Sequence, residues 1–504
     1  MTERTRFWLL AGLIGLAFAL RVYGLDFQSL WRDEVDVIRF AAFPLSRLAR
    51  LFVAPGQNGP LFYLAVRPWL ELAGRSEFAL RFFSAAFGTL AVPLIYRLGR
   101  RLFPTLPSVP LVAAFLATTS PYLVWYGQEG KMYTFVVVLI LLSMERYLAA
   151  LELGGWHRWL LYVVSTSVAF YVHFIAALVI PAQVLIFLFW SSGARKVRWK
   201  PWLASMAVLV VPYLPFLRWQ MPLLLDSGSS GYDFVPLHKM LYSLLTSYSL
   251  GVVQRSTIWS VALFVGALLA SALLLKGQRS RLASLAVLVS WLLVPVLAFF
   301  LITLIRPMYT ARYLIFVLPA YLLLLAAGVV AIARQSRLLA SFLLVAVLAA
   351  NGLGFWLQAR EPIKTDFRAA TSYLVGRMAP NDLILFQIPY GRYSFDYYRE
   401  QYSERPAALS SGGEFQVFLP LVVGGGARPY RWAEGPYTNA GMDLGELDRR
   451  MRGITAGGGV VWLVATEVAL WDERGLVKAW LDDHARLTSE AQFVRVVIYR
   501  YQLP

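Results

Sequence analysis

The sequence predicts a polytopic α-helical membrane protein that carries a small α/β domain in its C-terminal part. Three observations lead to this fold class. The 504 residues are 58% hydrophobic and 15% charged, with a mean hydropathy of +0.58. Apolar segments of about 20 residues, long enough to cross a hydrocarbon core of ~30 Å as a helix, recur through residues 1–357. Residues 358–504 lack such segments and alternate apolar runs with glycine-rich and charged stretches.

Eleven apolar segments are expected to cross the membrane. They lie near 7–24, 79–101, 108–124, 132–150, 159–173, 175–190, 202–218, 257–275, 283–304, 313–333 and 338–357. The first follows Arg4 and Arg6 and has no clear small-residue cleavage site, so it is expected to remain as an anchor.

Basic residues between these segments predict their orientation. Clusters of Arg and Lys fall at every second boundary, namely at residues 4–6, 97–101, 146–158, 195–200, 276–281 and 334–337. Cytoplasmic loops carry such an excess, so these boundaries are assigned to the cytoplasm. The extracytoplasmic side then receives 25–77, 125–131, 219–256, 305–312 and the domain 358–504, which follows the transmembrane module 1–357. We therefore expect a multi-pass protein of the cell membrane.

The net charge of +18 comes entirely from the membrane part of the chain. Residues 358–504 contain 17 basic and 17 acidic residues, which leaves 30 basic and 12 acidic residues in 1–357. A basic excess between membrane segments is the positive-inside pattern, so no nucleic-acid partner is expected. The chain contains no cysteine and therefore no disulfide framework.

The C-terminal domain is expected to mix strands and helices. Residues 382–387, 460–465 and 494–499 have the apolar, β-branched character of strands, whereas 369–378 and 476–484 have helical patterns. Gly457-Gly-Gly459 precedes a strand instead of joining a strand to a helix, so a nucleotide-binding motif is not expected.

Two acidic motifs lie in the expected extracytoplasmic loops. Gln28-Ser-Leu-Trp-Arg-Asp-Glu-Val-Asp36 contains Asp33 and Glu34, and Tyr122-Leu-Val-Trp-Tyr-Gly-Gln-Glu-Gly-Lys-Met-Tyr133 contains Glu129 and Lys131. The first motif is either a catalytic carboxylate at the membrane surface or a solvated interfacial loop. The second is either part of the same site or a hairpin capped by charges. If they converge, one carboxylate can act as a base while another supports it or binds a divalent metal, so a metal is left open.

Other polar residues on the same side are candidates for binding. Arg81, Arg306 and Arg312 run against the positive-inside pattern and suit either a bound phosphate or interfacial positions. His173 is either a structural hydrogen-bonding group or part of a site. His238 and Arg255 lie in 219–256, which is either a lid or a plain connection.

These motifs together resemble the GT-C glycosyltransferases, in the branch of the protein O-mannosyltransferases and the lipid A aminoarabinose transferase. The resemblance rests on Ser29–Glu34, Gly59–Tyr63 with Ser76–Ser84, Ser120–Tyr133 and Tyr171–Phe174, with Arg312-Tyr-Leu314 as a weaker match. It covers residues 1–190 well and the later segments loosely.

The resemblance implies an enzyme that moves a sugar from a polyprenyl-phosphate donor to an acceptor hydroxyl on the extracytoplasmic face. It implies Asp33 as the catalytic base beside Glu34, with Glu129 as the second carboxylate. Asn58 stands where the family often has His or Lys, so phosphate binding is assigned to Arg81, Lys131, Arg306 or Arg312. The substrate-site candidates are Asn58, Tyr63, Tyr126, Gln128, Tyr133, His173, His238 and Arg255.

In-line attack opposite the phosphate predicts inversion at the anomeric carbon, with a glycan, lipid or protein as acceptor and membrane lipids around the apolar segments. The alternative function is a lipid or sugar transporter or flippase. A transporter is expected to place charges within its spans and to show repeated halves, whereas here the charges gather in loops. The sequence does not identify the sugar, the acceptor or the oligomeric state.

Overall fold

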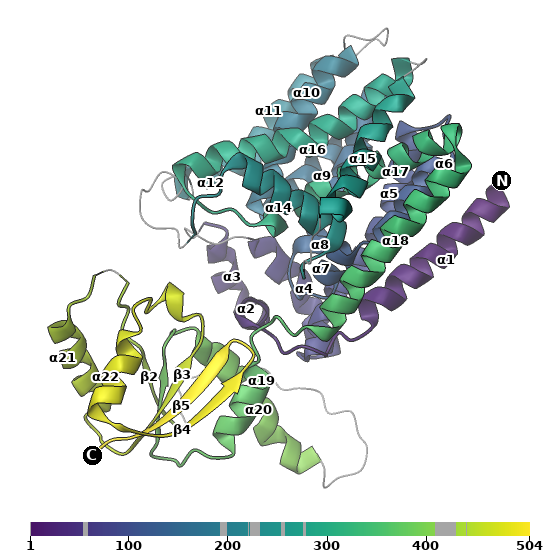
Figure 1. Ribbon diagram of the computed structural model, residues 1–504. Coiled ribbons are helices and arrows are strands. Elements are labelled where there is room, and N and C mark those ends of the chain that lie inside the picture. Colours follow the sequence, from purple (N-terminus) through teal and green to yellow (C-terminus); the bar gives the residue numbers. More distant parts are fainter. Residues whose placement is uncertain are drawn as a thin grey trace. The chain divides into compact units, whose positions relative to one another are not determined.

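The computed structural model describes the chain apart from residues 1, 54–58, 192–198, 220, 222–231, 254–257, 276–278, 409–429 and 440. The chain forms two compact units (Figure 1). Unit 1 comprises Met1–Leu25, Phe43–Leu72 and Phe78–Glu361, and unit 2 comprises Asp26–Ala42, Ala73–Glu77 and Pro362–Pro504. The predicted domains 1–357 and 358–504 divide the chain by membrane topology and stay predictions.

In the described residues of unit 1, all regular secondary structure is helical. Its elements are α1 (Glu3–Val22), α3 (Leu45–Leu51), α4 (Pro60–Ala73), α5 (Glu77–Leu102), α6 (Ser108–Thr119), α7 (Pro121–Gly127), α8 (Tyr133–Leu153), α9 (Trp156–Val172), η1 (Phe174–Leu178), α10 (Val179–Ser191), α11 (Trp199–Val210), η2 (Val211–Tyr213), α12 (Leu214–Trp219), α14 (Leu237–Leu250), α15 (Ile258–Ala270), η3 (Ser271–Leu275), α16 (Arg279–Ile305), η4 (Ala311–Val317), α17 (Leu318–Gln335) and α18 (Arg337–Arg360). Each of the eleven expected spans contains helix, and the polytopic α-helical fold is confirmed.

Fewer helices meet a strict length test for crossing a membrane. Within the described ranges, α1, α5, α8, α16, the η4–α17 segment and α18 are long and apolar enough, which makes six. The pair α6–α7, bent by 57°, makes a seventh if it is one span. The other expected spans are shorter or interrupted: residues 202–218, for example, are divided among α11, η2 and α12 around Pro212.

The centre of unit 1 is α17, which lies beside α6, α15, α16 and α18. Its buried residues lie all round the helix, as expected for a helix in the middle of a bundle. A Cβ on Gly328 would lie 1.7 Å from the carbonyl oxygen of Ala267, so glycine allows the α15 and α17 backbones to touch. Such close approach at small residues is how membrane helices gain packing contacts.

Two segments expected as loops contain helices. Residues 25–77 hold α2 (Arg32–Ala41), α3 and α4, and residues 219–256 hold α14. In α2 the buried residues Glu34, Val35, Val37, Ile38 and Ala41 follow helical spacing. Asp33 and Glu34 occupy its first turn, where the helix dipole favours negative charge. The acidic motif is therefore a helix start.

Unit 2 contains a five-stranded sheet with the order β2-β1-β3-β5-β4. The strands are β1 (Leu383–Phe386), β2 (Arg431–Glu434), β3 (Val460–Ala465), β4 (Arg486–Phe493) and β5 (Val496–Gln502), and the helices besides α2 are α19 (Phe367–Val375), α20 (Gly391–Ala408), α21 (Leu444–Thr455) and α22 (Leu476–His484), with a short η5 (Val468–Leu470). β1 runs parallel to β2 and β3, and β5 runs antiparallel to β3 and β4. The three expected strands and two expected helices are present.

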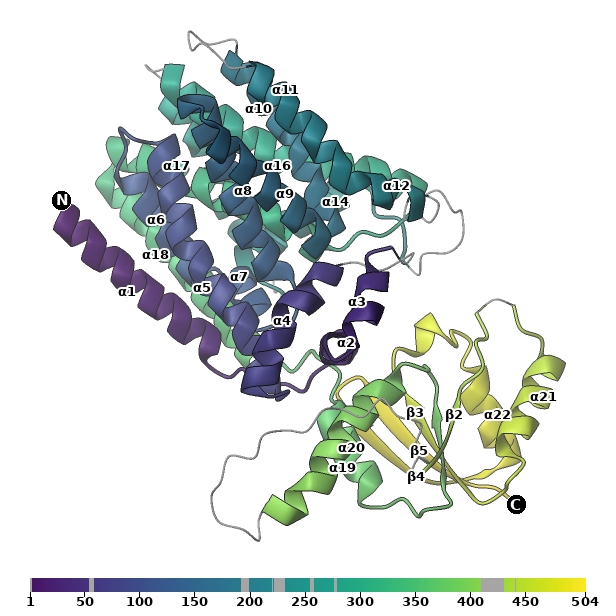
Figure 2. The same cartoon turned by 180° about the vertical axis from the view of Figure 1, so that it is seen from behind.

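Helices cover both faces of this sheet, as the two opposite views show (Figure 2). Leu383 and Leu385 share a core with residues of α21 and α22. The intervening residues point the other way, since Phe386 meets Phe395 of α20 and Trp462 meets Tyr373 of α19. β1 is buried on both faces, which is why it reads as a continuous apolar run.

Candidate active site

The best-formed candidate site of unit 1 begins at a break between α6 and α7. Pro121 has no N–H with which to continue the hydrogen bonding of α6, so the helix ends and the chain bends by 57°. Ser120 then caps α7, because its Oγ accepts a hydrogen bond from the Leu123 N–H at 3.3 Å. The break directs Tyr122 and Tyr126 of α7 towards the neighbouring helices.

A cavity of about 290 Å³ lies beside α7. It is lined by Tyr122, Tyr126, Ser243, Ser247, Val252, Tyr309, Thr310, Ala311 and Arg312. Three phenol rings, three side-chain hydroxyls of Ser and Thr, and one guanidinium therefore face one space. Its size and its few convergent polar groups are typical of a small-molecule site.

A carboxylate and a guanidinium lie around the same tyrosines. The rings of Tyr122 and Tyr126 are 4.7 Å apart, and those of Tyr126 and Tyr133 are 5.0 Å apart. Glu129 and Arg312 both act electrostatically on Tyr126 and on Tyr133. The structure thus brings Arg312 of η4 to three residues of the second acidic motif, Tyr126, Glu129 and Tyr133.

His173 joins this cluster from the end of α9. Its ring lies 6.2 Å from that of Tyr133 and 5.5 Å from that of Tyr313. Neither ring nitrogen makes a hydrogen bond to another described residue. The charged side chains of Lys131 and Arg312 both act electrostatically on the His173 ring.

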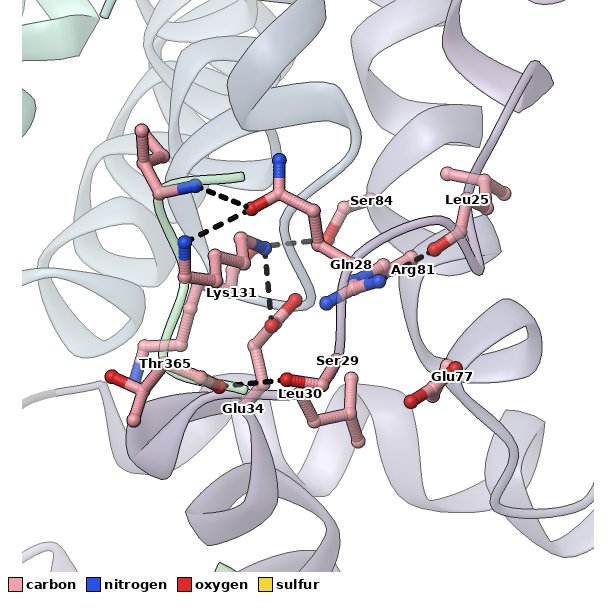
Figure 3. A network of polar contacts seen from close by, with 12 residues as sticks. Leu25, Gln28, Ser29, Leu30, Glu34, Glu77, Arg81, Ser84, Lys131 and Thr365 are labelled. Carbon is pink, nitrogen blue, oxygen red and sulfur yellow. Dashed lines mark hydrogen bonds and ion pairs between the residues drawn. The ribbon is translucent and has the colours of Figure 1, made fainter. Parts of the chain in front are cut away.

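The other phosphate-binding candidates lie in different surroundings. Lys131 is buried, and its backbone carbonyl accepts from Ser84 Oγ at 3.0 Å. Arg81 is also buried, and its Nη1 donates to the Leu25 carbonyl at 2.6 Å, which holds the chain just after α1 (Figure 3). Arg306 is half-buried at the end of α16 and does not line the cavity.

The remaining substrate-site candidates are more scattered. Tyr63 is buried in α4 beside Phe62, and His238 is exposed in the first turn of α14. Gln128 donates from Nε2 to the carbonyls of Leu20 and Tyr23 at 3.1 and 2.7 Å. Asn58 and Arg255 lie outside the described residues.

Asp33 and Glu34 belong to unit 2, where the first acidic motif is tied to the segment after Pro362. Gln28 Oε1 accepts from the N–H groups of Ile363 and Lys364 at 3.1 and 2.9 Å, and Ser29 Oγ donates to the Thr365 carbonyl at 2.7 Å (Figure 3). These contacts fix the segment before α2 to Ile363–Thr365, more than 300 residues away in the sequence.

The two carboxylates of this motif differ in their surroundings. Glu34 is fully buried, and its Oε2 lies 3.1 Å from Lys364 Nζ. Asp33 keeps 20% of its side chain exposed and pairs with Arg32 at 3.2 Å. Asp33 is thus the accessible carboxylate, whereas Glu34 is engaged in a buried ion pair.

The sequence did not single out several cavity residues. Tyr122 lies inside the quoted second motif, and Tyr309 lies between the two arginines at 306 and 312, so both stood next to recognised signals. Ser243 and Ser247 are four residues apart and share a face of α14. They were missed because 219–256 was expected to be a loop.

No group of three or more His, Asp or Glu residues suited to a metal occurs among the residues that the structure describes.

Comparison with known proteins agrees with this architecture. The profile of the family described as dolichyl-phosphate-mannose-protein mannosyltransferase matches residues 57–219, which include Glu129, Lys131 and His173. The crystal structure of ArnT from Cupriavidus metallidurans bound to undecaprenyl phosphate is 13% identical, with 99% of this chain and 98% of that chain covered and a TM-score of 0.59. The chain therefore has the fold of the GT-C membrane glycosyltransferases.

Two further structures share the GT-C fold. The oligosaccharyltransferase of Archaeoglobus fulgidus is 12% identical over 95% of this chain and 71% of that chain, with a TM-score of 0.57. The arabinofuranosyltransferase AftD from mycobacteria is 15% identical over 100% of this chain and 40% of that chain, with a TM-score of 0.52. No curated protein matches the sequence. The predicted GT-C fold is confirmed, and the site residues stay predictions.

The buried ion pair of unit 2 gives a first testable prediction. Lys364→Met leaves the Glu34 carboxylate buried without its cation, which costs about 3–5 kcal/mol. We expect the α2 amides of the full-length protein to exchange with deuterium at least about 100-fold faster, because about 1.4 kcal/mol corresponds to a factor of ten.

The control is the double variant Glu34→Leu/Lys364→Met, which replaces both charges by apolar groups and is expected to restore most of the protection. Unchanged exchange in Lys364→Met alone would show that the pair does not hold α2.

Proposed function

We propose that the protein transfers a sugar from a polyprenyl-phosphate-linked donor to an acceptor hydroxyl on the extracytoplasmic face of the membrane, with inversion at the anomeric carbon. The observation that carries this proposal is the cavity of unit 1, in which Arg312 and three tyrosines meet beside Glu129. The GT-C fold supports a membrane glycosyltransferase, and the donor, the stereochemistry and the base are further parts of the proposal.

The polar groups of the cavity suit a sugar phosphate. A guanidinium matches phosphate oxygens with two parallel hydrogen bonds, which assigns the donor phosphate to Arg312, with Lys131 near the same cluster. The rings of Tyr122 and Tyr126 present apolar faces for a sugar and hydroxyls for its oxygens. The ArnT structure that shares this fold was determined with undecaprenyl phosphate, which supports a lipid phosphate here.

The leaving group explains why few catalytic groups are needed. A polyprenyl phosphate departs as an anion that carries its own negative charge, so the site must hold that anion and remove a proton from the acceptor. We assign the base to Asp33, which pairs with Arg32 and remains partly exposed to solvent. The cation favours the ionised carboxylate, the form that accepts a proton.

Glu34 and Glu129 receive different roles under this proposal. Glu34 anchors α2 through Lys364, so it positions Asp33, its neighbour in the sequence. Glu129 lies among the tyrosines of the cavity and balances the charge of Arg312. A divalent metal is not required for these steps.

The proposed orientation rests on the positive-inside pattern. The basic clusters at alternate helix ends belong in the cytoplasm, which places the α6–α7 break and unit 2 on the opposite side. A glycan, a lipid or a protein hydroxyl can serve as acceptor there.

Transfer assays with purified protein, radiolabelled polyprenyl-phosphate sugars and candidate acceptors test the carboxylates. We expect Asp33→Asn to lower kcat by about 100-fold or more, because a positioned general base raises the reaction rate by at least about that factor. Glu129→Gln is expected to lower kcat/KM by about tenfold or more through Arg312. Asp36→Asn, on the same helix and paired with Arg39, is the matched control and should retain activity. Undiminished transfer by Asp33→Asn would remove the base assignment.

Binding measurements test the phosphate site separately from catalysis. Arg312→Gln should weaken the binding of undecaprenyl phosphate by about 10- to 100-fold, since a hydrogen bond to a charged group contributes about 1.5–3 kcal/mol. Arg360→Gln, an exposed arginine at the end of α18, is the control and should bind normally. Equal affinities for the wild type and Arg312→Gln would move the phosphate away from this cavity.

A further inference from the structure

Arg21 is a buried arginine in the last turn of α1, and among the residues that the structure describes it forms no ion pair with a carboxylate. Its side chain is fully buried, and its three hydrogen bonds all go to backbone carbonyls. Nη1 donates to Ala17 at 3.0 Å and to Thr118 at 3.4 Å, and Nη2 donates to Ala117 at 3.0 Å. A buried cation in a membrane helix is costly, so its placement calls for a compensating role.

Two of these carbonyls, those of Ala117 and Thr118, are at the end of α6, where the break leaves them without a backbone donor. In an unbroken helix the N–H of residue 121 would bond to the carbonyl of Ala117, but Pro121 has no N–H. Unsatisfied carbonyls in an apolar environment cost several kcal/mol in general. The Arg21 guanidinium supplies the missing donors and so caps the C-terminal end of α6.

The connection after α7 in turn caps the C-terminal end of α1. Gln128 follows α7 directly, and its Nε2 donates to the carbonyls of Leu20 and Tyr23 at the C-terminal end of α1. Each helix end is thus capped by a side chain from the other segment. We call this pair of contacts, made by Arg21 and Gln128, the reciprocal cap.

Two glycines make room for the arginine. A Cβ on Gly88 of α5 would lie 2.9 Å from Arg21 Nε, and a Cβ on Gly127 of α7 would lie 3.1 Å from Arg21 Cγ. Both distances are shorter than an ordinary contact, so alanine at either position would push the guanidinium out of place. By contrast, a Cβ on Gly12 or Gly15 of α1 would meet nothing within 4 Å.

We infer that Arg21 and Gln128 are positioning residues that set the place of Glu129 in the site. Glu129 is the next residue after Gln128, and the backbone turns at once because the Lys131 N–H donates to the Glu129 carbonyl at 2.7 Å. The reciprocal cap therefore fixes both the direction of α7 and the start of the Glu129 turn. This inference rests on the proposed function for the role of Glu129. It gives Gln128 a structural contact in place of a contact with substrate.

The kinetic signature of a positioning residue differs from that of a binding residue. We expect Arg21→Met to lower kcat by about tenfold, no more than the loss expected for Glu129→Gln, because the variant acts by displacing Glu129. Its affinity for undecaprenyl phosphate should stay within about twofold, because Arg312 lies on η4, outside the reciprocal cap. Arg21→Lys, which keeps the charge and three donors, should recover most of the lost kcat. Gln128→Met should follow Arg21→Met.

The glycines supply a matched pair of variants. Gly127→Ala should lower kcat by about tenfold, whereas Gly12→Ala should leave it unchanged. If Gln128→Met weakens substrate affinity and leaves kcat intact, Gln128 contacts substrate and the inference fails. Wild-type kcat in Arg21→Met would also overturn it.

Thiol labelling tests the inference without any transfer activity. The sequence has no cysteine, so Glu129→Cys introduces a single thiol at a position that is 3% exposed. We expect a maleimide to label Cys at 129 about tenfold faster when Arg21→Met is added. Ile315→Cys, fully buried in η4, is the control and should be labelled at the same rate in both backgrounds.

The labelling outcomes separate this inference from the proposed function. Faster labelling at both positions would mean general loosening, and no change at 129 would mean that the cap does not position Glu129; either result overturns the inference. Faster labelling at 129 alone would support it even if every donor failed in the transfer assay, which would refute only the proposed function.

Discussion

The structure depends on how a broken membrane helix satisfies its backbone. The chain stops α6 at Ser120-Pro121 and restarts as α7 at an angle of 57°, which exposes carbonyls where water is scarce. Arg21 donates to two of them from α1, and Gln358 of α18 donates to the Pro121 carbonyl at 3.1 Å. A straight helix needs neither donor. The break is nevertheless what turns Tyr122 and Tyr126 towards the cavity. Forming a cavity inside the bundle therefore requires buried polar side chains that donate hydrogen bonds to the open carbonyls.

A second constraint acts in unit 2 and is ionic. Glu34 is fully buried and is stabilised there by Lys364, while Gln28 and Ser29 add hydrogen bonds to the same distant segment. Breaking such a pair is far more damaging than its net contribution suggests, because one buried charge is left alone. The pair therefore contributes little net stability, but it fixes the position at which α2 begins. Asp33, one residue earlier, takes its position from this attachment and stays accessible.

The sequence predicted the features that follow from hydropathy and local pattern. Each apolar span contains helix, and Val460–Ala465 and Leu476–His484 form the expected strand and helix. Tyr126, Glu129 and Tyr133 were chosen from one motif and Arg312 from a later loop, and the fold brings them together. What failed was the reading of 25–77 and 219–256 as loops, because short amphipathic helices such as α2 and α14 carry too few residues for a clear period.

The long-range capping contacts of Arg21 could not be predicted from the sequence, for a physical reason. Arg21 appears in the sequence as one more basic residue at the end of an apolar segment, where snorkelling to the interface is the ordinary expectation. Its actual partners are carbonyls, which every residue possesses, so no residue type marks them. The Glu34–Lys364 pair could not be predicted either, because its members are separated by 330 positions in the sequence.

Under the proposed function, these constraints bear on how few charged groups the site needs. A donor that already carries an anionic leaving group needs one guanidinium for its phosphate and one carboxylate for the acceptor proton, and aromatic rings can hold the sugar. Each charge that is buried in the bundle loses its solvation by water, so a small number of charges is favoured. Among the described residues of unit 1, Glu129, Lys131 and Arg312 lie near the cavity, with His173 beside them. Under this proposal the His173 imidazole can give or accept a hydrogen bond with a sugar hydroxyl.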